Sequence, residues 1–158
     1  MHLTASEIDI LRATLGIRAA RLFCPAPSIW NTHLEASSYT IWLDSAPDFL
    51  NIFAVEQAQY DFRIAVERSA NPRDFQYDSQ TCSVKDCSDI FLETKDPSTI
   101  RQIGIYQRNG TDWALLFEFD KGGSFGITAG VVPDEVCFFW NSDWGRTKET
   151  LTLRSVIE

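Results

Sequence analysis

The chain contains few of the residues on which catalytic and metal sites are most often built. Among 158 residues there are two histidines, four cysteines and one methionine. The histidines are His2 and His33, both near the start of the chain. So few imidazoles and thiols argue against a histidine-based acid–base site and against a cysteine-rich metal site.

The cysteines are scattered and do not form a disulfide framework. Cys82 and Cys87 are separated by four residues, which matches neither a C-x-x-C motif nor the usual spacing of zinc ligands. Two alternatives remain for this pair: a disulfide between Cys82 and Cys87, or a metal site that also uses His33 or Cys24. We favour the simpler interpretation, in which Cys24 and Cys137 are small apolar residues of strands.

The sequence also lacks a long apolar run. No stretch approaches the ~18 residues of a membrane-spanning helix. The opening segment MHLTASEIDILRATLG has neither the basic region nor the apolar run of a signal peptide. We therefore expect a soluble cytoplasmic protein with reduced thiols and no membrane partner.

Positive charge is scarce as well, with 14 Lys and Arg against 22 Asp and Glu and a formal net charge of −8. Such a surface repels phosphates, which argues against a nucleic acid as partner. Apolar residues are abundant at 44% and aromatic residues at 13%. A chain of this length and composition is expected to form one domain, residues 1–158, with a packed core.

The first residues carry a helix signal. Thr4 and Glu7 stand in the order of a capping box, apolar residues follow at helical spacing, and Gly16 provides a stop. This pattern predicts a helix from about Ala5 to Leu15.

Short apolar-rich segments of strand length make up much of the remaining chain. They are IRAARLF, YTIWLD, FLNIFAV and YDFRIAVERS, then IRQIGIYQ, DWALLFEFD, SFGITAG and EVCFFW, and finally TLTLRSVI. Asn109-Gly110 predicts a tight hairpin after the fifth segment. Alternation predicts one buried face consisting of Trp113, Leu115, Phe117 and Phe119, with Phe125 and Ile127 across the next turn.

These segments predict an α+β fold in which the N-terminal helix packs on a mainly antiparallel β-structure. About seven to nine strands would form either a sandwich or one strongly curved sheet. The two runs, 17–69 and 100–142, also resemble each other, with Phe49 opposite Phe125 and Asp61 opposite Asp134. An internal repeat of a β-meander and two unrelated meanders both remain open. The polar, acidic residues 70–97 between them are expected to form a long loop.

The stretch FEFDKGGSFGITAG contains Gly122-x-Ser124-x-Gly126, the pattern of a serine-hydrolase nucleophile elbow. That elbow needs a helix after the serine and, in that fold, a histidine later in the chain. Here a β-rich segment follows Ser124, and both histidines precede it. The pattern therefore predicts a hairpin turn with Ser124 as a turn residue.

The segment IRQIGIYQRNGTDWALLFEFDKGGSFGITAGVVPDEVCFFW consists of strand, tight turn, Trp-led strand, glycine turn, strand, and Pro-Asp before a last strand. In this pattern the chain resembles immunity proteins of bacterial polymorphic-toxin and contact-dependent inhibition systems. The resemblance implies a protein that binds tightly to a cognate, basic toxin domain and neutralises it. The resemblance assigns no binding residues. Because the sequence has no catalytic or metal-binding pattern, we expect a non-catalytic protein without cofactor or metal.

Acidic residues outside the expected core are the candidates for contact with a basic partner. They are Asp74, Asp78, Asp86 and Asp89 in the central region, with Asp143 and Trp144 near the C-terminus. Two alternatives stay open. One is a small-molecule-binding protein or enzyme whose sheets enclose a pocket lined by aromatic residues such as Trp30, Trp42 or Trp113. The other is an assembly subunit that uses exposed strand edges.

Overall fold

The computed structural model describes the backbone of residues 1–25, 28–29, 33–36, 38–58, 61–71, 73, 75–77, 80–82, 84–86, 99–129, 136–140 and 148–158. Side chains are described for residues 1–19, 21–23, 38–56, 62–71, 73, 99–129 and 148–158. All statements about the structure concern these residues.

The N-terminal helix α1 spans Ala5–Thr14, one residue shorter than expected from the sequence. The capping box is formed: the Thr4 hydroxyl accepts a hydrogen bond from the Glu7 backbone, and the Thr4 backbone donates to the Glu7 carboxylate at 2.7 Å. Gly16 follows the helix at a φ of +79°, a conformation that glycine adopts without strain. The signals that predicted the helix are those that begin and end it.

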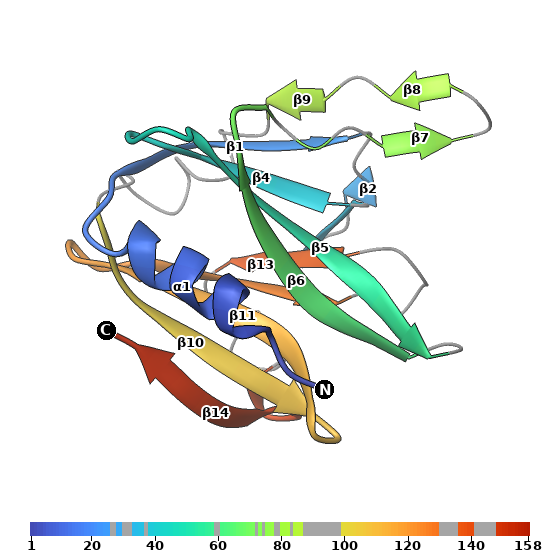
Figure 1. Cartoon of the computed structure of the whole chain (residues 1–158), viewed down its shortest axis with the longest axis vertical. Coiled ribbons are helices and arrows are strands. Elements are labelled where there is room, and N and C mark those ends of the chain that lie inside the picture. Colours follow the sequence, from blue (N-terminus) through green and yellow to red (C-terminus); the bar gives the residue numbers. More distant parts are fainter. Residues whose placement is uncertain are drawn as a thin grey trace.

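Two antiparallel sheets and a small ribbon contain the described strands (Figure 1). The first sheet has the order β6-β5-β4-β1-β9, with β6 at Asp61–Ser69, β5 at Phe49–Ala58, β4 at Ser38–Leu43, β1 at Ala19–Pro25 and β9 at Val84–Asp86. The second has the order β14-β10-β11-β12-β13-β3-β2. Its strands are β14 at Thr152–Ile157, β10 at Ile100–Arg108, β11 at Thr111–Phe119, β12 at Ser124–Ala129, β13 at Val136–Trp140, β3 at His33–Ala36 and β2 at Ser28–Ile29. The ribbon pairs β7, Phe75–Tyr77, with β8, Gln80–Cys82.

The two sheets share one hydrophobic core, so the expected α+β fold is present in its sandwich form. From the first sheet the core takes fully buried residues such as Tyr39, Ile41 and Ile52. From the second it takes Phe117 and Phe125, whose rings stack with centroids 5.0 Å apart. Burial of these aromatic and branched side chains is the main source of stability in such a fold.

Helix α1 closes one side of the sandwich, beside β6 and β10 (Figure 1). Leu3 and Leu11 enter the shared core from the helical segment. Glu7 binds β6 as well, because its carboxylate accepts hydrogen bonds from Arg63 Nη1 at 2.9 and 3.0 Å and from the Val66 backbone at 3.3 Å. The capping residue of the helix is thus also its attachment to the end strand of the first sheet.

The predicted buried face of β11 is correct for three residues and wrong for the fourth. Leu115, Phe117 and Phe119 are buried in the core, but Trp113 is only half-buried. The pairs Tyr106↔Ala114 and Gln107↔Asp112 leave Trp113 without a partner across the ladder, which is a bulge. The bulge places Trp113 against a small second apolar cluster that includes Tyr106. Phe125 and Ile127 are buried in the core as expected.

Nine of the described strands have five or more residues, at the upper end of the expected seven to nine. The additional short strands are β2, β3, β7, β8 and β9, none longer than four residues. Three of them lie in the segment 70–97 that was expected to be a loop; Val84, which offered a strand there, begins β9. Three-residue polar strands have no recognisable period, and their pairing with distant strands decides their conformation.

The runs β1-β4-β5-β6 and β10-β11-β12-β13 are each contiguous in one sheet, although β2 and β3 of the second sheet lie between β1 and β4 in the chain. Phe49 is half-buried on β5, whereas Phe125 lies in the core on β12. Whether the two runs arose by duplication stays a prediction.

Within the described residues, no helix has the length and apolar character needed to cross a membrane.

Candidate functional site

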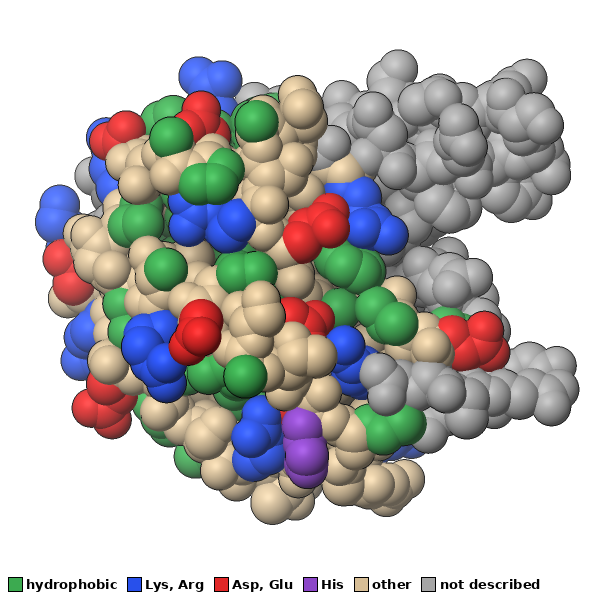
Figure 2. Space-filling model, viewed as in Figure 1, with side chains coloured by type: hydrophobic (Ala, Val, Ile, Leu, Met, Phe, Trp, Pro, Cys, Tyr) green, Lys and Arg blue, Asp and Glu red, His purple; other side chains and the backbone are tan. Residues whose placement is uncertain are grey.

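Acidic and basic side chains are balanced over the part of the sandwich whose side chains are described. Eleven of each are described, so their formal charges cancel. Figure 2 shows them interspersed on one face of the molecule. The sandwich has further acidic residues, Glu35 on β3 and Asp61 on β6, whose side chains are not described. The range 74–98 alone holds six acidic and two basic residues.

Of the candidate contact residues, Asp86 lies on β9, where its backbone is opposite Phe23 of β1. The structure thereby attaches one part of the acidic range to the edge of the first sheet. The remaining candidates lie outside the described residues: Asp74, Asp78, Asp89, Asp143 and Trp144.

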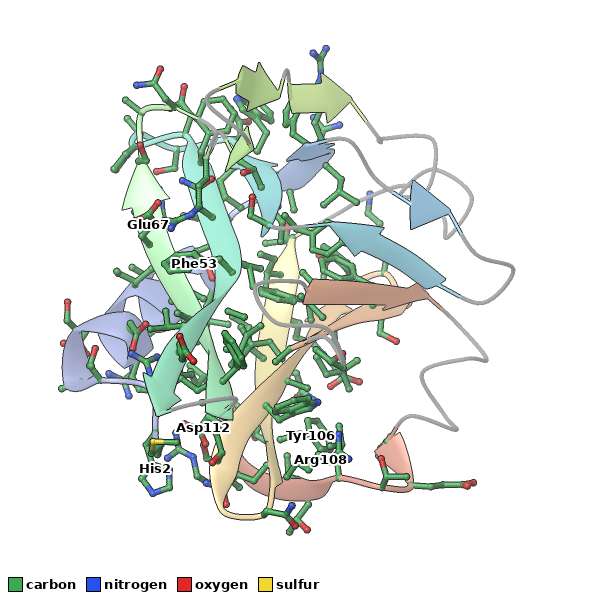
Figure 3. The ribbon with its side chains drawn as sticks, turned by 90° about the vertical axis from the view of Figure 1, so that its right-hand side faces the viewer. His2, Phe53, Glu67, Tyr106, Arg108 and Asp112 are labelled. Carbon is green, nitrogen blue, oxygen red and sulfur yellow. The ribbon has the colours of Figure 1, made fainter. Side chains whose placement is uncertain are left out.

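Residues that precede the acidic range are bound to the outer face of the first sheet. The Arg73 backbone donates to Asn51 Oδ1 at 3.1 Å, and its guanidinium binds Glu67 at 3.2 Å. The same guanidinium lies 3.8 Å from the ring centroid of Phe53. Figure 3 shows Phe53 and Glu67 on neighbouring strands. These contacts fix the chain at the residue immediately before Asp74.

Asn51 is the centre of this polar network and is 1% exposed. Its Oδ1 also accepts from the Thr40 hydroxyl at 2.5 Å, and its Nδ2 donates to Glu67 and to the Asn71 carbonyl, each at 3.3 Å. A buried amide with all these partners is a positioning element, since leaving any of them unpaired is costly. Apolar–polar alternation in FLNIFAV gave no indication of this role for Asn51.

The Gly122-x-Ser124-x-Gly126 pattern forms a hairpin, as predicted. Gly122 and Gly123 have φ angles of +83° and +91°, and the Phe119 backbone donates to the Gly123 carbonyl at 3.1 Å. Ser124 begins β12 and lies opposite Glu118 of β11. A strand and not a helix begins at Ser124, so the strand–turn–helix geometry of a nucleophile elbow is not formed there.

The histidine whose side chain is described, His2, belongs to a network around Asp112 at the other end of β11 (Figure 3). Asp112 is fully buried and accepts hydrogen bonds from the Leu3 backbone at 2.7 Å and from Gln107 at 3.0 Å. Arg154 donates to both of its carboxylate oxygens, at 2.8 and 2.7 Å. The seven steps from Asp112 to Phe119 span roughly 23 Å of strand, so this network is remote from Ser124.

The environment of Asp112 keeps its carboxylate ionised. Burial alone would raise its pKa, but the hydrogen bonds from Leu3, Arg154 and Gln107 and the positive charge of Arg154 outweigh burial, and the pKa lies below its usual value. Because each carboxylate oxygen is already engaged, we assign Asp112 a structural role: it connects the N-terminal segment, β11 and β14.

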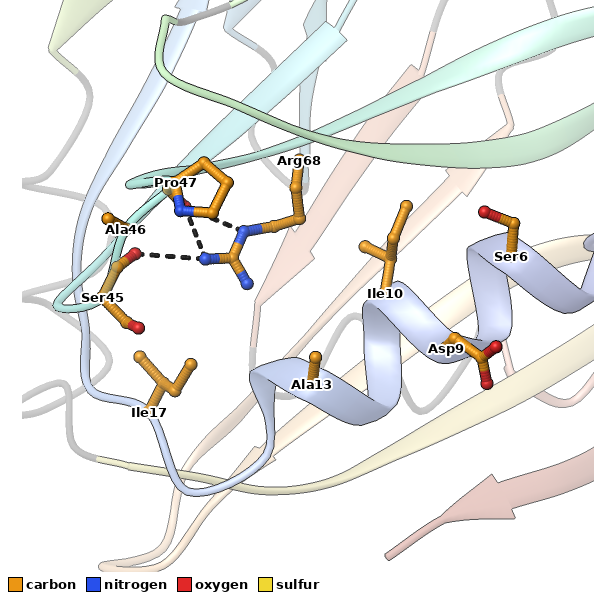
Figure 4. Close-up of a pocket in the computed structure, with 9 residues that line it drawn as sticks. All are labelled: Ser6, Asp9, Ile10, Ala13, Ile17, Ser45, Ala46, Pro47 and Arg68. Atoms are coloured by element: carbon orange, nitrogen blue, oxygen red, sulfur yellow. Dashed lines mark hydrogen bonds between the residues drawn. The ribbon is translucent and has the colours of Figure 1, made fainter.

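A surface pocket of about 460 Å³ lies between α1 and the turn that joins β4 to β5 (Figure 4). Its lining is Ser6, Asp9, Ile10, Ala13, Ile17, Ser45, Ala46, Pro47 and Arg68. Arg68 Nε donates to the Pro47 carbonyl at 2.9 Å, and Nη2 donates to the carbonyls of Ser45, at 3.1 Å, and Pro47. Burial lowers the pKa of Arg68, and the charge of Asp48 opposes that effect. Nothing in the sequence pattern singled out this arginine.

Neither of the two pockets described in the structure has Trp42 or Trp113 in its lining, and a pocket lined by tryptophans stays a prediction. Trp42 lies on β4 of the first sheet and Trp113 on β11 of the second, where Arg108 stands 5.2 Å from its ring centroid. Trp30 lies outside the described residues. The pocket beside Arg68 has an aliphatic lining instead.

The described residues do not include a group of three or more His, Cys, Asp and Glu side chains arranged to hold a metal. Cys24 and Cys137 lie on β1 and β13, as expected for strand residues. Cys82 ends β8, whereas Cys87 lies outside the described residues, so pairing of these two is not tested.

Comparison of the chain with protein families, with curated proteins and with solved structures gives no match. Function is therefore inferred from the chain's own charges, contacts and cavities.

Proposed function

We propose that this protein is a non-catalytic binding module of the immunity type, which binds and neutralises a cognate basic toxin domain through its acidic segments. The observation that carries the proposal is the distribution of charge. Residues 74–98 hold six acidic and two basic residues, so half of the formal net charge of −8 falls in this one range of the chain. An excess needed only for solubility has no reason to be concentrated in this way.

The attachment of the acidic range 74–98 to the first sheet supports the same proposal. Before it, Arg73 is fixed by Asn51, Glu67 and Phe53; within it, β9 pairs with β1. A charged segment held at two places loses less conformational entropy when a partner binds than a free tail does. Opposite charge on the partner then increases the association rate and selects against acidic competitors.

The test begins with the partner. Co-purification from the native host identifies the protein that binds, and sequencing the neighbouring gene provides an independent candidate. Binding of the purified pair is then measured by surface plasmon resonance at low and at high salt. We expect affinity to fall as salt rises, mainly through a slower association rate, because screening acts on the encounter of opposite charges.

Two sets of charge reversals separate a specific acidic surface from a general effect of net charge. The first replaces Asp74, Asp78, Asp86 and Asp89 with Lys. The matched control reverses four exposed acidic residues of the described part, Asp44, Asp48, Asp120 and Glu149. We expect the first set to weaken binding by about tenfold or more and the control to have a much smaller effect. Equal effects of the two sets, or binding that does not depend on salt, would contradict the proposal.

A further inference from the structure

The pocket between α1 and the β4–β5 turn contains a positive charge that neutral groups hold in place. Three N–H···O contacts fix the Arg68 guanidinium, and the carbonyls of Ser45 and Pro47 accept all of them. Figure 4 shows the third guanidinium nitrogen turned away from these carbonyls, toward the side of the pocket formed by the helix. This nitrogen, Nη1, has no hydrogen-bond partner among the described residues.

The remaining lining is mostly apolar and small. Ile10 and Ala13 come from one face of α1, and Ile17 comes from the segment before β1. The volume of about 460 Å³ lies within the range of small-ligand sites. The pocket therefore offers an apolar wall beside two oriented N–H groups of a cation.

We propose that this pocket binds a small monocarboxylate whose carboxylate accepts hydrogen bonds from Arg68 Nη1 and whose apolar body packs on Ile10, Ala13 and Ile17. Charge-assisted hydrogen bonds of this kind are about twice as strong as neutral ones. Because the two carbonyls already hold the guanidinium in place, Arg68 loses little further side-chain entropy when a ligand binds. Burial lowers the pKa of Arg68, so a bound anion would relieve the cost of keeping the cation there.

Neighbouring charges restrict the ligand to a single negative charge. Asp9 lines the pocket, and the charge of Asp48 is close enough to act on Arg68. These carboxylates would repel the second charge of a phosphate or the several charges of a nucleotide. A second pocket, of about 390 Å³ between α1 and β14, contains two arginines. There Arg12 pairs with Asp9 and Arg154 with Asp112, so both cations are already paired.

The proposal is tested by titrating the protein with sodium hexanoate and following its backbone amides by NMR. Hexanamide serves as the uncharged control and inorganic phosphate as the multiply charged one. Hexanoate is expected to shift the amides of α1, Ser45, Ala46, Asp48 and Arg68, and to bind at least about tenfold more tightly than hexanamide or phosphate. Absence of local shifts with hexanoate would overturn the proposal, and so would equal binding of hexanamide.

Three variants assign the binding to this pocket. Arg68→Gln removes the cation, and Ala13→Leu fills the apolar side of the pocket at an exposed helix position. Arg18→Gln, an exposed arginine outside the lining, makes the same change of charge. We expect Arg68→Gln and Ala13→Leu each to reduce hexanoate affinity at least about tenfold, and Arg18→Gln to leave it unchanged. If Arg68→Gln fails to fold, the test rests on the Ala13→Leu variant and on the comparison of hexanoate with hexanamide. Undiminished binding of hexanoate to Ala13→Leu would overturn the proposal.

Discussion

Individual side chains in this protein act through burial and through complete pairing of the charges that are buried. Phe117 contributes only apolar area, whereas Asp112 contributes a charge whose oxygens are all engaged. The first type of residue stabilises by its removal from water and the second by its hydrogen bonds. Substitutions at the two sites should therefore differ in their dependence on pH.

Replacing Phe117 with Ala should lower the free energy of unfolding by about 3–5 kcal/mol, because it leaves a cavity against Phe125 in the core. Chemical denaturation monitored by circular dichroism measures this change. Leu153→Ala is the control, since Leu153 is 49% exposed. A loss below about 1 kcal/mol at Phe117 would show that the core does not depend on this ring.

Replacing Asp112 with Asn should destabilise the protein at neutral pH by about 2 kcal/mol, because Arg154 loses a charged partner. The folded-state pKa of Asp112 is lowered. Its contribution is therefore complete above the unfolded value of ~4 and is lost as pH falls through the folded value. The difference between wild type and variant should shrink below about pH 4. Urea denaturation across pH measures it, and a pH-independent difference would contradict this role.

At the scale of elements, local signals determine where each helix and turn forms, and side chains from distant elements hold them in place. Thr4 and Glu7 begin α1, but Arg63 of β6 attaches it to the sheet. Similarly, two glycines form the β11–β12 turn, and the ladder between the strands determines what each residue faces.

Replacing Glu7 with Gln should detach α1 from β6 without abolishing the helix signal, because Gln also serves in a capping box. Arg63 is 8% exposed, and its Nε has no hydrogen-bond partner among the residues that the structure describes, so without Glu7 it would become a buried cation lacking its counter-charge. We expect a loss of about 3 kcal/mol. Thermal unfolding measures the loss, with Asp9→Asn as control because Asp9 forms only an exposed ion pair with Arg12. Equal losses in both variants would contradict the attachment.

Replacing Gly123 with Val should cost about 1–3 kcal/mol, because a β-branched residue is strained at a φ of +91°. Ser124→Ala at the next position should change stability by less than about 0.5 kcal/mol and leave binding intact. Denaturation of the two variants tests the hairpin interpretation. Labelling of Ser124 by a fluorophosphonate would instead indicate a nucleophile.

For the whole molecule, the position of charge along the chain matters more than its total. Residues 74–98 carry half of the formal net charge of −8, and part of this range, β9, pairs with β1. Reversal of charge in that range is expected to change association with little change in the folded core, since the buried core residues described, such as Phe117 and Ile52, come from other segments.

Accordingly, replacing Asp74, Asp78, Asp86 and Asp89 together with Lys should change the free energy of unfolding by less than about 1 kcal/mol while weakening binding to a basic partner. Reversal at Asp143 tests the second acidic segment in the same way. Denaturation and binding are measured on the same preparations. Unfolding of the variant would show that the acidic range serves the fold instead of a partner.

The sequence by itself determined the helix, the hairpin turns and most of the long strands. Those elements depend on neighbours in the chain: the Thr4–Glu7 cap, the Asn109-Gly110 turn and the alternation along β11 each act over a few residues. For the same reason the hairpin at Ser124 was recognisable without a structure.

Only the tertiary structure decided the bulge at Trp113, the register of the two meanders, the short strands and the pocket at Arg68. Each depends on residues far apart in the chain, such as Arg68 with Ser45 and Pro47, and no local pattern encodes which distant groups will meet. The location of charge along the chain was present in the sequence throughout. Only the structure showed that part of the acidic range pairs with the edge of the first sheet, because β9 and β1 are far apart in the chain.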